Sequence, residues 1–318
     1  MSTTEAPEVE APAVIEFRSV SKWYGQVIGV NNLSLRIGKG VTGLLGPNGA
    51  GKSTLLQLAT GQLRPSQGEV RVLGARPWNN AGLNRHIGLC PEQDAMFEWM
   101  TGRSFLRACG SLAGLGRRAA REAADRVLEQ VKMTAAADRP VRGYSKGMRQ
   151  RTKLAQALIH DPEVLFLDEP LTGTDPVARH ELMELVAGLA RQGRTILVSS
   201  HVLYEVQSLT SQIVLVNHGR LVAFGDVRQI RDLIDAHPHR IVLKGPDRRA
   251  LAAKLVRWDD VEGVELPRDE RAIVVETRAP DRFYQRLPRL AREADAPIEE
   301  IYSDDDSLEA VFKYLVNP

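Results

Sequence analysis

The 318-residue sequence predicts an α/β fold with a parallel sheet at its centre. Three apolar runs of strand length support this prediction: VTGLL at 41–45, VLFL at 164–167 and TILVS at 195–199. Each run is rich in Val, Ile and Leu and is bounded by turn residues, which is typical of strands buried on both faces. Helical patterns separate the runs, as parallel strands that follow one another require.

Two segments that precede this core alternate apolar and polar residues. The apolar positions are Val14, Ile15 and Phe17 in the first segment and Leu33, Leu35 and Ile37 in the second. A period of two predicts half-buried antiparallel strands, so we expect an antiparallel β subdomain at the edge of the core.

The composition between Asp94 and Asp161 changes to Arg, Ala and Leu at helical spacing. Thr101 and Ser145 are placed to cap two helices, and REAADRVLEQV at 121–131 continues another. The last of these helices is expected to stop at the Asp161-Pro162 pair. The pattern predicts a helical subdomain, at about 95–160, inserted in the core.

Residues 240–318 have the pattern of a separate, smaller unit. Strand and helix patterns follow one another there in the order β-α-β-β-α-β, with a final helix from Ser307. This order matches a small ferredoxin-like α+β sandwich. At the other end of the chain, residues 1–13 are predicted to form a disordered acidic tail that does not resemble a secretory signal.

Composition restricts the classes of function. The net charge of +2 provides no general field that would draw the chain to nucleic acid, and no nucleic-acid partner is expected. No segment approaches the roughly 20 consecutive apolar residues that cross a bilayer. Cys90 and Cys109 lack the spacing of metal ligands, so we interpret them as two packed thiols in a reducing compartment.

A phosphate-binding loop is the strongest functional signal. GPNGAGKST at 46–54 follows a predicted strand and precedes the helical STLLQLATG. The glycines allow backbone N–H groups to turn toward phosphate oxygens, and the helix N-terminus favours negative charge. Lys52 is placed to reach the β- and γ-phosphates, and the Ser53 hydroxyl to ligate Mg²⁺. The residues of the loop are Gly46, Pro47, Asn48, Gly49, Ala50, Gly51, Lys52, Ser53 and Thr54.

Two acids follow the buried run VLFL at the carboxyl end of the sheet, where open α/β folds bind ligands. Asp168 is placed to hold Mg²⁺ through water, and Glu169 to polarise an attacking water. The alternative is a solvated acidic strand end, which the phosphate loop in the same chain disfavours.

Three further residues are ambiguous from spacing alone. Gln93 lies in a loop between the core and the helical insert, and its amide can reach a metal or a water. His201 ends the strand-like TILVSSH and is placed either to contact the γ-phosphate or to cap and pack. Tyr24 either stacks on a base or packs like an ordinary aromatic residue.

The segment YSKGM at 144–148 places a serine, a lysine and a glycine at a predicted helix start, which looks like half of an anion site. With GPNGAGKST, Gln93, VLFLDE, LTGTD and His201 it stands in the order and spacing of an ABC transporter nucleotide-binding subunit. The chain resembles this family over about 15–225. The resemblance implies a P-loop NTPase core with an antiparallel β edge subdomain and an inserted helical subdomain, in an ABC ATPase domain at 14–235 that is followed by the accessory domain at 240–318.

The resemblance also implies roles within one ATP and Mg²⁺ site. Tyr24 stacks on adenine, residues 46–54 hold the phosphates, and Asp168 holds Mg²⁺. Glu169 is the general base, and Lys52 and His201 contact the γ-phosphate.

Other implied roles depend on partners. Gln93 contacts the metal and senses the membrane subunit. Ser145 and Gly147 contact the γ-phosphate bound to a second ATPase subunit, which is another copy of this chain or a related one. Lys146 adds a cation beside that ATP, and Asp175 belongs to the loop that crosses the dimer interface.

The motifs depart from the family at four positions. The usual signature is LSGGQ, whereas this chain has Tyr144, Lys146 and Met148 in the first, third and fifth places. The segment LTGTD has Thr174 where leucine is usual.

The SKGM variant and the small C-terminal domain look like the exporter branch that works with a separate transmembrane permease, such as drug, polysaccharide, sodium and nodulation-factor exporters. A peripheral location on the cytoplasmic face of the cell membrane is then expected. Trp99, Met100 and Phe105 are candidate permease contacts or pack inside the insert. Two alternatives stay open: a soluble ABC ATPase acting on ribosomes or DNA, and a nucleotide-gated regulatory subunit with little turnover.

Overall fold

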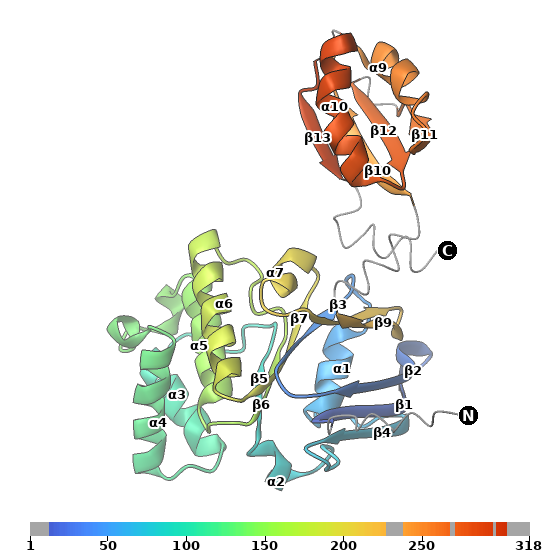
Figure 1. Ribbon diagram of the computed structural model, residues 1–318. Helices are drawn as coiled ribbons and strands as arrows, with labels where there is room; N and C mark the ends of the chain where they lie inside the picture. Colours follow the sequence, from blue (N-terminus) through green and yellow to red (C-terminus); the bar gives the residue numbers. More distant parts are fainter. Residues whose placement is uncertain (1–12, 227–237, 268–270, 295–296, 304–318) are drawn as a thin grey trace, which may run out of the picture. The chain divides into compact units, whose positions relative to one another are not determined.

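The computed structural model spans residues 1–318 and describes 13–226, 238–267, 271–294 and 297–303 (Figure 1). The chain divides into two compact units, 1–225 and 226–318. The predicted domain boundary between 235 and 240 stays a prediction. All but the last residue of the predicted tail at 1–13, and the predicted helix from Ser307, lie outside the described residues.

A six-stranded sheet forms the centre of the first unit. In spatial order its strands are β5 (Ile87–Cys90), β6 (Val164–Leu167), β7 (Thr195–Ser200), β3 (Val41–Leu45), β8 (Gln212–Asn217) and β9 (Arg220–Asp226). Neighbours from β5 to β8 pair in parallel, which confirms the predicted core. Leu45 pairs with Ser200 and Leu167 with Val198, so the carboxyl ends of β3, β6 and β7 meet at one edge.

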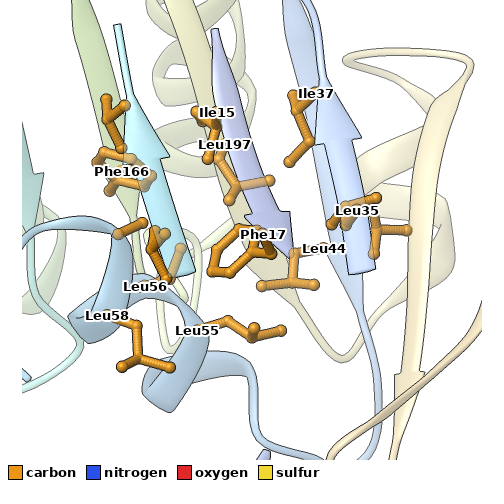
Figure 2. Close-up of a cluster of buried hydrophobic side chains, with 14 of the residues drawn as sticks. Ile15, Phe17, Leu35, Ile37, Leu44, Leu55, Leu56, Leu58, Phe166 and Leu197 are labelled. Carbon is orange, nitrogen blue, oxygen red and sulfur yellow. The ribbon is translucent and has the colours of Figure 1, made fainter. Parts of the chain in front are cut away.

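The predicted antiparallel edge is a three-stranded sheet in the order β2-β1-β4. Its strands are β1 (Ile15–Tyr24), β2 (Val27–Ile37) and β4 (Gln67–Val72), of which sequence patterning missed the third. Helix α1 (Lys52–Ala59) lies between the two sheets, and Figure 2 shows their side chains converging on one core. Labelled members include Ile15, Phe17, Leu35 and Ile37 from the edge, Leu55, Leu56 and Leu58 from α1, and Leu44, Phe166 and Leu197 from the central sheet.

The residues between β5 and β6 are helical, as predicted, and lie to one side of the sheet (Figure 1). They form α3 (Gly102–Leu112), α4 (Arg117–Gln130), the 3₁₀ turns η1 (Thr134–Ala136) and η2 (Val141–Gly143), and α5 (Lys146–Leu158). Thr101 caps α3 and Ser145 caps α5 through their side-chain oxygens. The other helices among the described residues of the first unit are α2 (Ala81–Asn84), α6 (Pro176–Arg191) and α7 (Leu203–Gln207).

The second unit has the predicted ferredoxin-like order. Strands β10 (His239–Lys244), β11 (Val261–Glu265), β12 (Ala272–Thr277) and β13 (Glu300–Ser303) alternate with α9 (Arg248–Leu255) and α10 (Pro280–Ala294). The spatial order β11-β12-β10-β13 is antiparallel throughout, and the helices bury Phe283 and Leu255 against it. Among the described residues of the whole chain, no helix is long and apolar enough to cross a membrane.

Both cysteines are packed thiols, as predicted. Cys90 is buried, and burial raises the pKa of its thiol to about 12. Cys109 is half-buried, and burial raises its pKa to about 11. Both groups therefore stay protonated near neutral pH.

The close approach of α5 to β5 generates a stability prediction. A Cβ atom added to Gly88 would lie 2.2 Å from the carbonyl oxygen of Ala157, so Gly88→Ala must push α5 away from the sheet. We expect the free energy of unfolding to fall by about 1–3 kcal/mol, the usual cost of overpacking. The matched control is Gly82→Ala, whose Cβ meets nothing closer than Asn80 Oδ1 at 3.5 Å. Equal urea midpoints for the two variants would contradict the proposed tight contact.

Candidate active site

The phosphate loop joins β3 to α1 through a backbone that needs glycine. Gly49 and Gly51 have φ angles of 81° and 104°, in the left-handed region. At Gly51 a Cβ would also lie 2.5 Å from the carbonyl oxygen of Gly29. Because α1 begins at Lys52, the N–H groups of its first turn lack helical acceptors and form an anion-binding helix N-terminus.

Lys52 is a buried cation held at this loop. Only 6% of its surface is exposed. Its Nζ atom donates to the carbonyl oxygen of Gly46 at 2.7 Å and lies 3.3 Å from Oε1 of Glu169. The loop is anchored from behind, since Gly219 N–H donates to the Ala50 carbonyl at 2.9 Å. The ammonium group is thus fixed where a bound phosphate would meet it.

Glu169 is the most constrained side chain of the site. It is 6% exposed, and its backbone φ of 47° lies in the left-handed region, a strained conformation for glutamate. Its Oε2 atom accepts a hydrogen bond from Thr172 Oγ1 at 3.0 Å and lies 2.9 Å from His201 Nδ1. Its Oε1 atom forms the ion pair with Lys52 but no hydrogen bond among the described residues.

Asp168 and Glu169 share one hydroxyl. Ser199 is fully buried at the end of β7, and its Oγ donates to Asp168 Oδ1 at 2.6 Å. The same Oγ accepts from the backbone N–H of Glu169 at 2.9 Å. Ser199 therefore fixes both acids relative to the strand that carries His201.

Tyr24 ends β1 beside the phosphate loop. Its ring is 44% exposed, and its hydroxyl lies 3.4 Å from Thr54 Oγ1. Gly29 leaves the space for the ring, because a Cβ there would lie 2.8 Å from Tyr24 Cε2. The ring thus presents an exposed face next to the residues that would hold phosphate.

The signature segment at 144–148 packs on the helices. Ser145 Oγ caps α5 by accepting from Met148 N–H at 3.3 Å, and Tyr144 donates its hydroxyl hydrogen to the Ala136 carbonyl at 2.8 Å. Ser145 and Lys146 are exposed. Among the described residues, no hydrogen bond or ion pair joins this segment to 46–54.

The segment at 171–175 forms a tight turn in front of α6. Thr174 is 7% exposed, and its Oγ1 donates to the Leu171 carbonyl at 2.6 Å. Asp175 caps α6 by accepting from Val177 and Ala178 N–H at 3.1 and 2.9 Å. The threonine that departs from the usual leucine therefore closes the turn with a hydrogen bond.

The structure thus gathers Lys52, Asp168, Glu169 and His201 at one sheet edge, with Tyr24 beside the loop. Gln93 is exposed on the loop after β5. Sequence reasoning missed Ser199 and Thr172, which orient the acids. For Ser199 a signal was present, because TILVSSH places hydroxyl groups at the end of a strand adjacent to the one that carries Asp168.

Comparisons with known proteins agree with this arrangement. Residues 30–172 match the family model described as ABC transporter. The chain is 34% identical to the daunorubicin resistance ATP-binding protein DrrA3 of Streptomyces coeruleorubidus, over 96% of each chain. It is also 34% identical to the Nod factor export ATP-binding protein I of Rhizobium meliloti (strain 1021), over 90% of this chain and 88% of that protein.

A solved structure titled as the ATP binding subunit of an ABC transporter superposes with a TM-score of 0.63 at 26% identity. The match covers 70% of this chain and 93% of that one. Fold, site geometry and sequence similarity therefore agree: the chain belongs to the ATP-binding subunits of ABC transporters, which are ATPases.

Proposed function

We propose that two copies of this chain, or this chain and a related subunit, hydrolyse ATP with Mg²⁺ to drive export through a separate membrane permease. The observation that supports the chemistry most directly is the cluster formed by the buried Lys52 and Glu169 with His201, whose side chain is 45% exposed. It combines a cation for phosphate, a carboxylate to receive a proton and an imidazole beside that carboxylate.

Phosphate binding follows from the charges at the loop. The first N–H groups of α1 and the Lys52 ammonium face the position of the β- and γ-phosphates. A phosphate oxygen at Lys52 competes with Glu169 Oε1, which lies 3.3 Å from the ammonium. That exchange leaves Oε1 able to accept a proton from water, whereas Thr172 and His201 still hold Oε2.

The oxygen ligands of the site suit a Mg²⁺ ion that also binds phosphates and water, rather than a metal ion that is held by protein ligands alone. Ser53 and Asp168 provide hydroxyl and carboxylate oxygens, the ligand types that Mg²⁺ prefers. No group of three or more His, Cys, Asp or Glu side chains among the described residues could cage a metal, which agrees with an ion bound mainly by phosphates and water. Bound Mg²⁺ would neutralise charge that develops on the phosphates.

Hydrolysis needs little covalent chemistry from the protein. In-line attack requires a water held beside the γ-phosphate and an acceptor for its proton. Glu169 is the general base in this proposal, and His201 contacts the γ-phosphate from the neighbouring strand. Tyr24 offers its exposed ring face to the adenine.

The exposed Ser145 and Lys146 of the signature segment support assembly with a second ATPase subunit, whereas Gly147 is buried. Ser145, Lys146 and Gly147 stand at the N-terminus of α5, a position that favours an anion. Since no polar contact among the described residues connects them to their own phosphate loop, we assign them to ATP bound by the partner. Two such contacts related by a twofold axis would close two sites.

A permease-docking surface is proposed between α3 and the loop after β5. Hollows of about 350 and 210 Å³ lie there, and both are lined by Pro91, Cys109 and Leu112. Leu112 and Trp99 are 88% and 76% exposed, whereas Phe105 is 5% exposed and packs inside the insert. The exposed apolar side chains suit a helix from the permease.

The direction of transport is inferred from relatives. Similar proteins are named for daunorubicin resistance and for Nod factor export, so we assign this chain to export. A peripheral position at the cytoplasmic face of the membrane follows from the proposed permease. The transported substrate would be set by that permease.

Replacing the general base tests the catalytic assignment. Glu169→Gln keeps the shape of the side chain but removes the proton acceptor, so we expect kcat to fall by about 10² or more while ATP binding persists. The matched control is Glu163→Gln, at an exposed glutamate just before β6 that pairs with His86. Wild-type turnover of Glu169→Gln in a steady-state phosphate-release assay would contradict the assignment.

Ser199→Ala tests the shared hydroxyl. The change leaves the buried Asp168 Oδ1 and the Glu169 N–H without the partner that now holds both. We expect the free energy of unfolding to fall by about 1–3 kcal/mol. We also expect the Mg²⁺ concentration for half-maximal ATPase activity to rise about tenfold. If the variant lost stability but kept the wild-type Mg²⁺ requirement, Ser199 would contribute to packing alone. Its proposed role in orienting the metal-binding carboxylate would then be wrong.

Purification from native membranes tests the partner. The full-length chain, tagged at its N-terminus and recovered in mild detergent, should bring down a polytopic membrane protein in roughly equal amount. Leu112→Arg should lower that recovery about tenfold, because it puts a charge on the proposed docking surface. The control Leu73→Arg alters a 37% exposed leucine in the turn after β4. Recovery of ribosomes or DNA-bound proteins, measured by mass spectrometry, would favour the soluble alternatives.

A further inference from the structure

Lys153 is a buried cation in the middle of α5, and none of the catalytic roles above involves it. Lys153 is 1% exposed, although lysine is almost never fully buried without partners. Its Nζ atom donates to the Glu92 carbonyl at 2.6 Å and pairs with Asp94 Oδ1 at 3.1 Å. A buried ammonium is costly unless it is paired and hydrogen-bonded, so these contacts are required once Lys153 is inside.

The two contacts lie on either side of Gln93. One is to the backbone carbonyl of the residue before it and the other is to the side-chain carboxylate of the residue after it, so Lys153 holds the loop on both sides of the glutamine. The Gln93 side chain itself is exposed. Lys153 therefore restrains where the amide points without touching it.

The same loop begins beside the catalytic acids. Strand β5 ends at Cys90, whose carbonyl accepts a hydrogen bond from Asp168 N–H at 2.8 Å. Helix α5 packs directly on β5, where the absence of a Cβ at Gly88 lets the Ala157 carbonyl approach. The Lys153 charge is near enough to oppose the burial that raises the pKa of Cys90. The lysine thus lies between α5 and the strand end that leads to the site.

Helix α5 also starts at the signature segment. Ser145 caps it, and Lys153 follows about two turns later, roughly 12 Å along the axis. Lys153 therefore connects the helix that Ser145 caps to the carbonyl before Gln93 and to the carboxylate after it.

We propose that Lys153 is a positioning residue for Gln93, which links α5 to the metal and nucleotide site through the Glu92 carbonyl and the Asp94 carboxylate. The inference rests on the proposed role of Gln93 as a metal contact. It does not depend on the permease or on transport, because its consequence is visible in ATP hydrolysis by the full chain.

Steady-state ATPase activity at fixed ATP and varied Mg²⁺ tests this role. Lys153→Met keeps the length of the side chain but removes its charge and hydrogen bond. We expect kcat to fall about tenfold and the half-saturating Mg²⁺ concentration to rise by a similar factor, as for other groups that orient metal contacts. Lys153→Arg restores a cation with several donors and should recover most of both values.

The combination with Gln93→Ala separates positioning from packing. If Lys153 acts through the glutamine, Lys153→Met causes little further change in a Gln93→Ala background. The matched control is Arg194→Met. Arg194 likewise bonds one carbonyl, of Pro162, and one carboxylate, of Asp161, but away from Gln93. It should lower the thermal unfolding midpoint without altering the Mg²⁺ requirement.

Two outcomes would overturn the inference. One is an equal loss for Lys153→Met in both backgrounds, which would mean that the lysine acts through packing. The other is a wild-type Mg²⁺ requirement for Lys153→Met while Gln93→Ala is impaired. Wild-type behaviour of Gln93→Ala itself would instead refute the proposed role of the glutamine, so the two failures can be told apart.

Discussion

The ion pair between Lys52 and Glu169 is the constraint on which the site depends. Both side chains are almost fully buried. Lys52 begins the helix that follows β3, and Glu169 follows β6, two strands that are separated in the sheet by β7. A slip of either strand would leave a buried charge without its partner, at a cost of several kcal/mol. The register of the central sheet is therefore held by charge pairing as well as by the apolar core beneath it. Glu169 also adopts a left-handed backbone, which persists only where the surroundings determine it from several sides.

The helical side of the first unit has a different organisation. There Ser145 and Lys146 of the signature segment are exposed, whereas Tyr144 and Gly147 are buried. Tyr144 is 6% exposed and lies against Gly102, where a Cβ would come within 2.3 Å of the tyrosine oxygen. The stem of Lys146 lies over Gly173, in the turn before α6. The signature segment and this turn thus form one connected surface, which a partner subunit would meet as a unit rather than as separate loops.

The sequence predicted the parts of the structure that depend on interactions between residues close together in the chain. The phosphate loop, the strand ends at Asp168 and His201, and the caps at Thr101 and Ser145 depend on residue type and spacing within short windows, and the structure has them as expected. Strands β5 and β4 were missed although β6 is as short, because IGLC and QGEVRV contain glycine and lack the unbroken apolar run that VLFL provides in β6. Contacts between distant segments were also inaccessible. Nothing local in the sequence reveals that Lys153 reaches Glu92, and the bond from Ser199 to Asp168 can be expected only once β6 and β7 are known to be neighbours.

Two of the departures from the usual family motifs are explained by contacts that the structure shows. Tyr144 fills space that the missing Cβ of Gly102 provides, and Thr174 satisfies the Leu171 carbonyl inside its turn. Both substitutions lie on the inner side of their segments, where a different side chain packs in place of the usual leucine. Ser145 and Gly147, which keep the family pattern, stand at the helix start. The variant signature therefore alters how the segment is supported while it preserves the groups that would meet phosphate. Lys146 is the exception, because it is exposed and adds a positive charge on the same side.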